Sequence, residues 1–309
     1  MKFVLCALLS LLLMSCGSLR NEVSPGTLIG ERDQLVVTCY LSPQDTVLAV
    51  KVTRSQSVLE DELQTVSSRN VVDATVTLSD GSRSAVLTYD NTTRPQSLRP
   101  YYNIRASAMP IIVGRTYTLT VVTPQGERAT STCTIPGAVN LTGVTFDSLQ
   151  SGNSQRYFVR ARWRDEAGRP NYYQTTGVFW FTADCATCPK DTSSLTTSDF
   201  AYLSFDDDNR GLFVDTDLDG TEMISGRAYL NGSNLNPGLP FMYRYQKASV
   251  TVNLLNVEQT YYQFWSAVVR QRRVRNNPFA EPVIIPSNIQ GGLGCFAGYN
   301  TASKNLVLR

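Results

Sequence analysis

Short runs of β-branched and aromatic residues, separated by turn signals, dominate the first part of this chain. The runs LVVTCYL and TVLAVKVTRS, residues 35–41 and 46–55, are split by the turn sequence SPQD. Later runs, such as VVDATVTL (residues 71–78) and TYTLTVVT (residues 116–123), have the same character. Roughly six or seven short strands at this spacing are typical of two packed antiparallel sheets. The sequence therefore predicts an immunoglobulin-like β-sandwich over residues 34–137.

The rest of the chain, residues 138–309, is also predicted to be β-rich, with one packed α-helix. The runs YFVRARWRD and ASVTVNLLNV have the alternation or the β-branched content of strands. Near residues 257–274 the apolar positions recur instead at intervals of three and four: Tyr261, Phe264, Trp265, Val268 and Val269. This spacing predicts a helix, which the sequence NNP would end. We interpret its aromatic face as packed against the core, with a sugar-stacking platform as the alternative.

Residues 1–15 predict a secretory signal peptide. Lys2 precedes an apolar run that is too short to span a membrane. The run ends in the sequence LMSC, which resembles the lipobox of bacterial lipoproteins, where the cysteine is acylated and becomes the first residue. The alternative is an ordinary cysteine near a cleavage site. We expect lipidation of Cys16, a tether over residues 16–33, and lipid anchoring in the outer membrane, on its periplasmic or its surface-exposed face.

The charge balance and the absence of histidine exclude several classes of function. The chain has 28 Lys and Arg against 26 Asp and Glu, and signal-peptide removal takes away only Lys2, leaving 27 against 26. A net charge near +1 provides no electrostatic basis for a nucleic-acid partner. Without histidine, Ser-His-Asp and Cys-His catalytic systems and His-ligated zinc are excluded. Carboxylate pairs, Ser-Lys pairs and oxygen-ligated metals remain available.

The cysteines beyond the lipidation site suggest two disulfides, because an exported chain meets oxidising conditions. Cys39 and Cys133 lie in the first and last predicted strands of the sandwich, and such strands can lie side by side. We predict a bridge between them, with two buried free thiols as the alternative. Cys185 and Cys188 form a CxxC in a polar loop, where we predict a local disulfide. A redox site would need a helix after a strand, and a zinc site would need further ligands.

An acidic stretch is the best chemical candidate in the sequence. Asp215, Asp217 and Asp219, followed by glycine, match the opening of a calcium-binding loop. The twelfth position, where such a loop has a bidentate glutamate, is Gly226. We therefore expect at most weak Ca²⁺ binding, and no other cofactor, with a solvated turn as the alternative. These carboxylates and residues 206–208 are also the candidates for a hydrolase mechanism.

Four tracts of the chain together resemble a known lipoprotein family. The tracts are VVDATVTLSDG, GRTYTLTVVTPQGERATSTCTIP, YYQFWSAVVRQ and NPFAEPVIIPSNIQGGLGCFAGY. The last is the most specific, and its motif consists of Ser287, Asn288, Gly291, Gly292 and Gly294. The chain is similar in these tracts to outer-membrane lipoproteins of Bacteroidota catalogued as domain of unknown function 4249. The glycine run lacks the GK[ST] of a phosphate loop, so we interpret it as a tight backbone turn against the core.

The resemblance implies an envelope setting, because members of this family are often encoded beside TonB-dependent outer-membrane transporters. It implies no catalytic residue, because none is established in the family. We therefore predict a lipid-anchored, non-enzymatic binding or accessory component of a TonB-dependent uptake system. The alternatives are a lipid-anchored, carboxylate-dependent hydrolase and a structural or adhesive surface lipoprotein.

Overall fold

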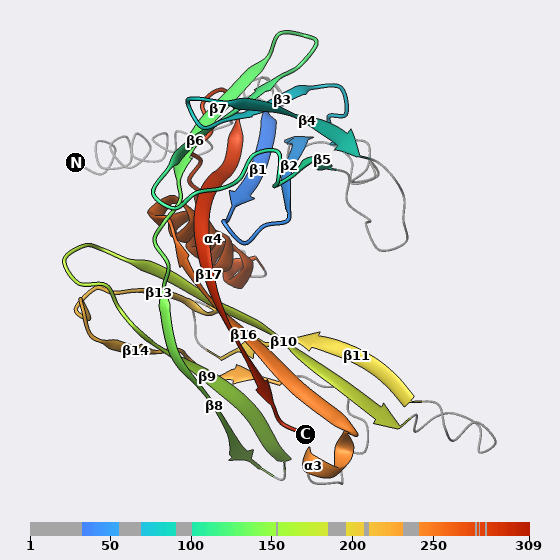
Figure 1. Ribbon diagram of the computed structural model, residues 1–309, viewed down its shortest axis with the longest axis vertical. Coiled ribbons are helices and arrows are strands. Elements are labelled where there is room, and N and C mark those ends of the chain that lie inside the picture. Colours follow the sequence, from blue (N-terminus) through green and yellow to red (C-terminus); the bar gives the residue numbers. More distant parts are fainter. Residues whose placement is uncertain are drawn as a thin grey trace, which may run out of the picture.

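One long strand, β17 (Leu293–Val307), runs through both halves of the molecule and joins them (Figure 1). Its first part pairs in parallel with β1 (Leu35–Leu41), and its second part pairs antiparallel with β16 (Lys247–Val257). The N-terminal half is therefore completed by a strand that lies within the predicted C-terminal range, residues 138–309, and outside residues 34–137.

The computed structural model describes most of the chain beyond the predicted tether. The residues that it describes are 33–55, 69–90, 101–152, 154–184, 196–206, 210–230, 241–275, 277, 279–281 and 283–309. The predicted signal peptide, the predicted lipidation site Cys16 and almost all of the predicted tether therefore lie outside the described residues, as do Cys185 and Cys188.

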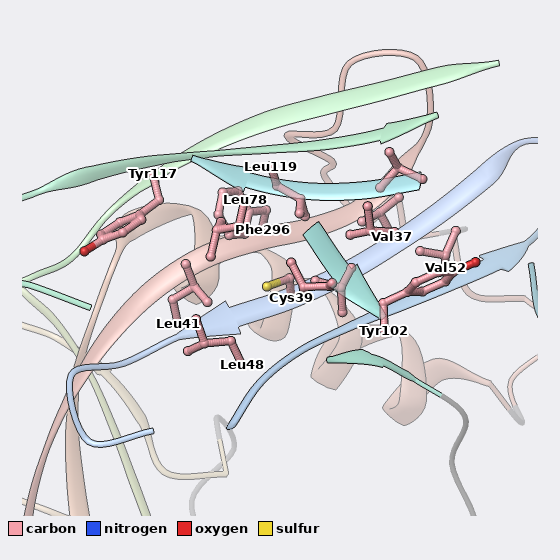
Figure 2. Packing of buried hydrophobic residues seen from close by; sticks show 14 of the residues in the cluster. Val37, Cys39, Leu41, Leu48, Val52, Leu78, Tyr102, Tyr117, Leu119 and Phe296 are labelled. Atoms are coloured by element: carbon pink, nitrogen blue, oxygen red, sulfur yellow. The ribbon is translucent and has the colours of Figure 1, made fainter. Parts of the chain in front are cut away.

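The N-terminal half is a two-layer β-sandwich. Its strands, in addition to β1 and β17, are β2 (Val47–Arg54), β3 (Thr75–Ser79), β4 (Ser84–Asp90), β5 (Tyr101–Arg105), β6 (Thr116–Val122) and β7 (Arg128–Thr134). They pair in the order β17-β1-β2-β5-β4-β3-β6-β7, so the path folds over through β4 and brings β3, β6 and β7 above β17, β1 and β2 (Figure 2). The predicted β-sandwich in this region is confirmed.

Alternating burial on the facing strands builds the core between these layers. Val37 and Leu41 on β1 point inward with Phe296 on β17, and they meet Leu78 and Leu119 from the opposite layer (Figure 2). Apolar residues at every second position of a strand share one face, so the runs noted in the sequence supply this core directly.

The C-terminal half contains two packed sheets and the main helix. Its other elements are β8 (Asn140–Ser151), β9 (Ser154–Arg164), β10 (Tyr172–Asp184), β11 (Thr196–Tyr202), β12 (Ser204–Phe205), β13 (Leu212–Val214), β14 (Glu222–Ile224), β15 (Ala228–Tyr229), α3 (Phe241–Arg244) and α4 (Gln259–Val274). One sheet has the order β11-β10-β16-β17, with β13 also on β10. The other has the order β12-β15-β9-β14, with β8 on β9. Trp163, Phe179 and Leu254 are among the buried residues between them.

Helix α4 confirms the helix predicted near residues 257–274. It begins after Glu258, and no helix among the described residues is long and apolar enough to cross a membrane. Tyr261 on its inner face is buried and meets Tyr40 of β1 edge-on, with ring centroids 5.1 Å apart. Trp265 also contacts Tyr40, at 6.2 Å. The aromatic face of the helix is therefore packed against the sheet, as interpreted from the sequence.

Candidate binding surface

The outer face of the sheet β11-β10-β16-β17 is covered by α4 at one end and open at the other. Side chains alternate along β10, so Phe179 is buried in the core and Trp180 points to the outer face. At the covered end, Tyr172 of β10 contacts Tyr262 of α4, with ring centroids 5.2 Å apart. At the open end Trp180 is 49% exposed, so no described element covers this end.

Three aromatic side chains form a cluster at the open edge of this sheet. Trp180 is directly opposite Phe200 on β11, and their ring centroids lie 5.0 Å apart. Phe200 meets Tyr202 edge-on at 5.7 Å. Phe200 and Tyr202 are 46% and 72% exposed. Removing apolar surface from water is favourable by roughly 25 cal/mol per Å². A contiguous exposed aromatic cluster therefore indicates a surface at which binding of a ligand or partner would lower the free energy.

A pocket of about 520 Å³ adjoins the indole of Trp180. Ser249 on β16 is opposite Trp180 on one side and opposite Val307 on the other. Because the serine side chain is short, the surface dips between the indole and the valine. This volume lies in the range of about 300–1,000 Å³ that is common for small-molecule sites.

Polar groups line the next row of the same pocket. The hydroxyls of Thr182 and Ser198 are 3.1 Å apart and share a hydrogen bond. Lys247 is opposite Thr182, and no acidic residue in the described part of the chain pairs with it. Among the described lining residues, Asp199 has the one carboxylate side chain, and its Oδ1 accepts the Phe200 N–H. The pocket thus combines an aromatic wall with hydroxyl and cationic donors, without a pair of carboxylates.

The asparagine and serine of the family motif make structural hydrogen bonds beside β17. Asn288 donates from Nδ2 to the carbonyl of Phe296 at 2.7 Å and accepts the Phe296 N–H at 3.0 Å. Its side chain thereby takes the hydrogen-bonding place of a neighbouring strand beside β17. Ser287 accepts the N–H of Ile289, which closes a short turn before the strand.

The motif glycines allow a tight turn and a close approach of backbones. Gly291 and Gly294 have φ of +78° and +119°, backbone conformations that residues with a side chain rarely adopt. A Cβ on Gly292 would lie 2.5 Å from the carbonyl oxygen of Leu35, and one on Gly294 would overlap the carbonyl of Val37. The motif therefore forms the turn that leads into β17 and allows the backbone of β17 to lie close to that of β1. This agrees with the interpretation as a tight turn.

The chain matches the family model described as "Domain of unknown function (DUF4249)" over residues 21–305. The chain belongs to the DUF4249 family. This match confirms the resemblance seen in the sequence and includes the whole SNIQGGLG motif. The comparison with curated proteins gives no match. Roles for residues of this DUF4249 chain therefore rest on its own geometry.

The predicted calcium-loop residues do not come together as a set. Asp215 and Asp219 lie with Asp165, their ligand oxygens all within 4.8 Å of one another. Asp217 is outside this group and is exposed, with a left-handed φ of +70°. Three carboxylates are oxygen ligands of the kind that Ca²⁺ accepts. However, Asp215 already accepts the Asn171 N–H at 2.8 Å, which is a structural use of this group.

The other two carboxylates also join loops. Asp165 accepts the N–H of Gly220 at 2.8 Å and the hydroxyl of Tyr173 at 2.6 Å. Asp219 accepts the N–H of Gly168 at 2.8 Å. These bonds fasten the loop after β9 to the loop after β13. Asp165 was not among the residues predicted from the sequence, although its place between a strand and the turn EAGRP was an available signal.

The predicted bridge between Cys39 and Cys133 is wrong. Both residues are free, buried cysteines in the structure. The prediction assumed that the first and last strands lie side by side. In fact β1 pairs with β17 and β2, whereas β7 pairs with β6 in the opposite layer. Cys295 is also free and buried, beneath α4, and burial raises its pKa to about 12.

The sequence analysis also missed the aromatic cluster around Trp180. The region that contains it, residues 138–309, was predicted only to be β-rich with one helix. Its signal was available, because three consecutive aromatic residues, Phe179, Trp180 and Phe181, cannot all point into one core from a strand. One of the three must lie on the outer face.

Proposed function

We propose that this protein is a lipid-anchored, non-enzymatic binding or accessory component of the outer membrane that holds a ligand on the open face around Trp180. The observation that carries the proposal is the pocket beside the exposed Trp180–Phe200 pair. A concave site with an aromatic wall and a few polar groups has the usual character of a ligand-binding site. The predicted acylation of Cys16 supplies the anchor.

The proposal includes association with a TonB-dependent outer-membrane transporter. This part rests on the resemblance to envelope lipoproteins that are encoded beside such transporters. A tethered binding protein raises the local concentration of its ligand at the membrane, which is useful where a transporter takes up that ligand.

The alternative of a carboxylate-dependent hydrolase has less support. Asp165 and Asp215 are buried, and each accepts a backbone N–H. A carboxylate-dependent glycoside hydrolase usually needs two carboxylates, one on either side of the scissile bond. The described residues that line the pocket beside Trp180 include one carboxylate side chain, that of Asp199. The alternative of a structural or adhesive surface protein has no specific observation in its favour.

Membrane fractionation and affinity purification from native membranes test the proposal. The wild-type protein should fractionate with the outer membrane and carry the added mass of acyl chains, and a TonB-dependent transporter should purify with it. Cys16→Ala should release the protein or block its processing. Cys6→Ala, which lies inside the apolar run, is the matched control and should leave anchoring unchanged.

Three results would count against this function. An unchanged mass and unchanged fractionation in Cys16→Ala would exclude the anchor. Complexes purified without any transporter would exclude the uptake role. A steady-state rate on a glycan, peptide or ester substrate that is lost in Asp206→Asn, Asp215→Asn or Asp219→Asn would favour the hydrolase.

A further inference from the structure

We propose that the open face binds a carbohydrate, with a sugar ring stacked on the indole of Trp180. This inference rests on the proposed function and names the ligand class of its site. It is carried by the side chains that the sheet places on one surface: an aromatic platform, a dip beside it, and rows of short hydroxyl and amide groups.

The aromatic platform fits the apolar face of a sugar ring. One face of a pyranose commonly presents several C–H groups, which pack on an aromatic ring and gain from its negatively polarised face. The indole of Trp180 is half exposed, and the ring of Phe200 is tilted by 41° to it. The two rings therefore form an angled surface, which Tyr202 extends along the edge strand.

The rows beside the platform fit the hydroxyl groups of a sugar. Thr182, Ser198 and Ser249 provide hydroxyls that both donate and accept, and Lys247 adds a donor. The next row of the same face continues this character, because Asn305 donates to the hydroxyl of Thr251 at 3.0 Å. Sugars need many weak hydrogen bonds spread over a flat surface, and these short polar side chains provide them without leaving buried groups unpaired.

Other ligand classes fit this surface less well. A lipid chain would need an enclosed apolar cavity, whereas this pocket is shallow and opens on the polar side chains of Thr182 and Lys247. A protein segment added to the edge of β11 would bind through backbone hydrogen bonds. It would then leave the hydroxyl rows and the pocket across β16 without contacts. A protein partner is therefore treated as an outcome of the experiment.

Tryptophan fluorescence of the detergent-solubilised full chain is a direct probe of this site. Trp163 is fully buried, and Trp265 on α4 is partly buried against Tyr40, so Trp180 is the most exposed of the three tryptophans. Titration with a panel of neutral and acidic oligosaccharides should shift the emission to the blue and protect it from acrylamide quenching, for at least one saccharide.

Two variants test the geometry, and a third is the control. Trp180→Ala removes the platform, and Ser249→Leu fills the dip while keeping the indole. Each should weaken binding of that saccharide by about tenfold or more, as expected for an aromatic anchor or its pocket. Phe279→Ala removes an aromatic ring that is 95% exposed elsewhere and should bind like the wild type. Calorimetry measures the affinities, because it does not depend on the removed tryptophan.

Three outcomes would overturn the carbohydrate assignment. The first is no binding of any panel saccharide at millimolar concentration. The second is saccharide binding that Trp180→Ala and Ser249→Leu leave unchanged. The third is self-association, lost in Trp180→Ala, without saccharide binding, which would assign the surface to a second copy of the chain. Membrane anchoring and transporter co-purification are measured without any saccharide, so they would still decide the proposed function separately.

Discussion

The carboxylate of Glu258 accepts a hydrogen bond from the backbone N–H of Thr134 at 2.6 Å. Its second oxygen accepts the N–H of Gly298 at 2.6 Å. Thr134 ends β7 of the N-terminal sandwich, Gly298 lies on β17, and Glu258 precedes α4. One half-buried side chain thus ties together three elements at the junction of the two halves.

We expect this carboxyl group to give the stability of the protein a pH dependence. Burial raises the pKa of Glu258 above its ordinary value of 4.5, although the two N–H groups lower it. The folded state therefore binds the proton more tightly than the unfolded chain. The stability contribution is fully present below the unfolded pKa and is lost as the pH rises through the folded pKa.

Glu258→Gln tests this expectation, because the variant cannot titrate at this position. The unfolding free energy of the wild type, minus that of the variant, should fall as the pH is raised from 4.5 towards neutrality. Denaturant unfolding at a series of pH values measures it. Burial also raises the pKa of Asp45, but that residue is present in both proteins and cancels. A difference that stays constant with pH would contradict the expectation.

Gly294→Ala should destabilise the protein strongly. The residue has a positive φ, and its Cβ would overlap the carbonyl of Val37, which is backbone and cannot move aside. We expect a loss of at least about 3 kcal/mol. Gly81→Ala is the matched control, because Gly81 also has a positive φ but has open space around it. It should cost only about 1–2 kcal/mol. Equal losses in urea unfolding would show that backbone strain alone decides both.

Asp165→Asn should weaken the contact between the loops after β9 and β13. The two oxygens of Asp165 accept from Gly220 and Tyr173, so the amide group of asparagine would face a donor instead. Leaving a buried donor without its acceptor costs about 1–3 kcal/mol. Asp217→Asn, at an exposed position that asparagine tolerates, should stay within about 0.5 kcal/mol of the wild type. Thermal unfolding compares them, and a similar loss in both variants would be evidence against the loop contact.

The three buried thiols should be present in the reduced form and unreactive in the folded protein. Burial is the main cause that raises the pKa of Cys39, Cys133 and Cys295, so each is protonated at neutral pH. Alkylation at pH 8 should leave them unlabelled, and denaturation without reductant should then allow all three to react. Peptide mapping by mass spectrometry identifies them. A disulfide-linked peptide pair containing Cys39 and Cys133 would contradict this expectation and support the predicted bridge.

Local periodicity determined where most elements lie. The run predicted over residues 35–41 is strand β1 (Leu35–Leu41), and the helix predicted near residues 257–274 is α4 (Gln259–Val274). Each element buries one face more fully than the other, so its apolar residues recur with the period of the strand or the helix. Such a pattern is readable without knowing the partner.

The pairing of distant segments was decided by the tertiary structure. The first part of β17, from Gly294 to Gly298, is buried on both faces, between the core of the N-terminal sandwich and α4, and therefore shows no alternation. The sequence likewise could not show that the carboxylates of Asp165 and Asp219 lie close together. It also could not show that Cys39 and Cys133 lie in opposite layers. A sequence pattern records how often a chain meets the core. Which strand lies beside which depends on backbone hydrogen bonds, and every residue type except proline offers the same donor and acceptor.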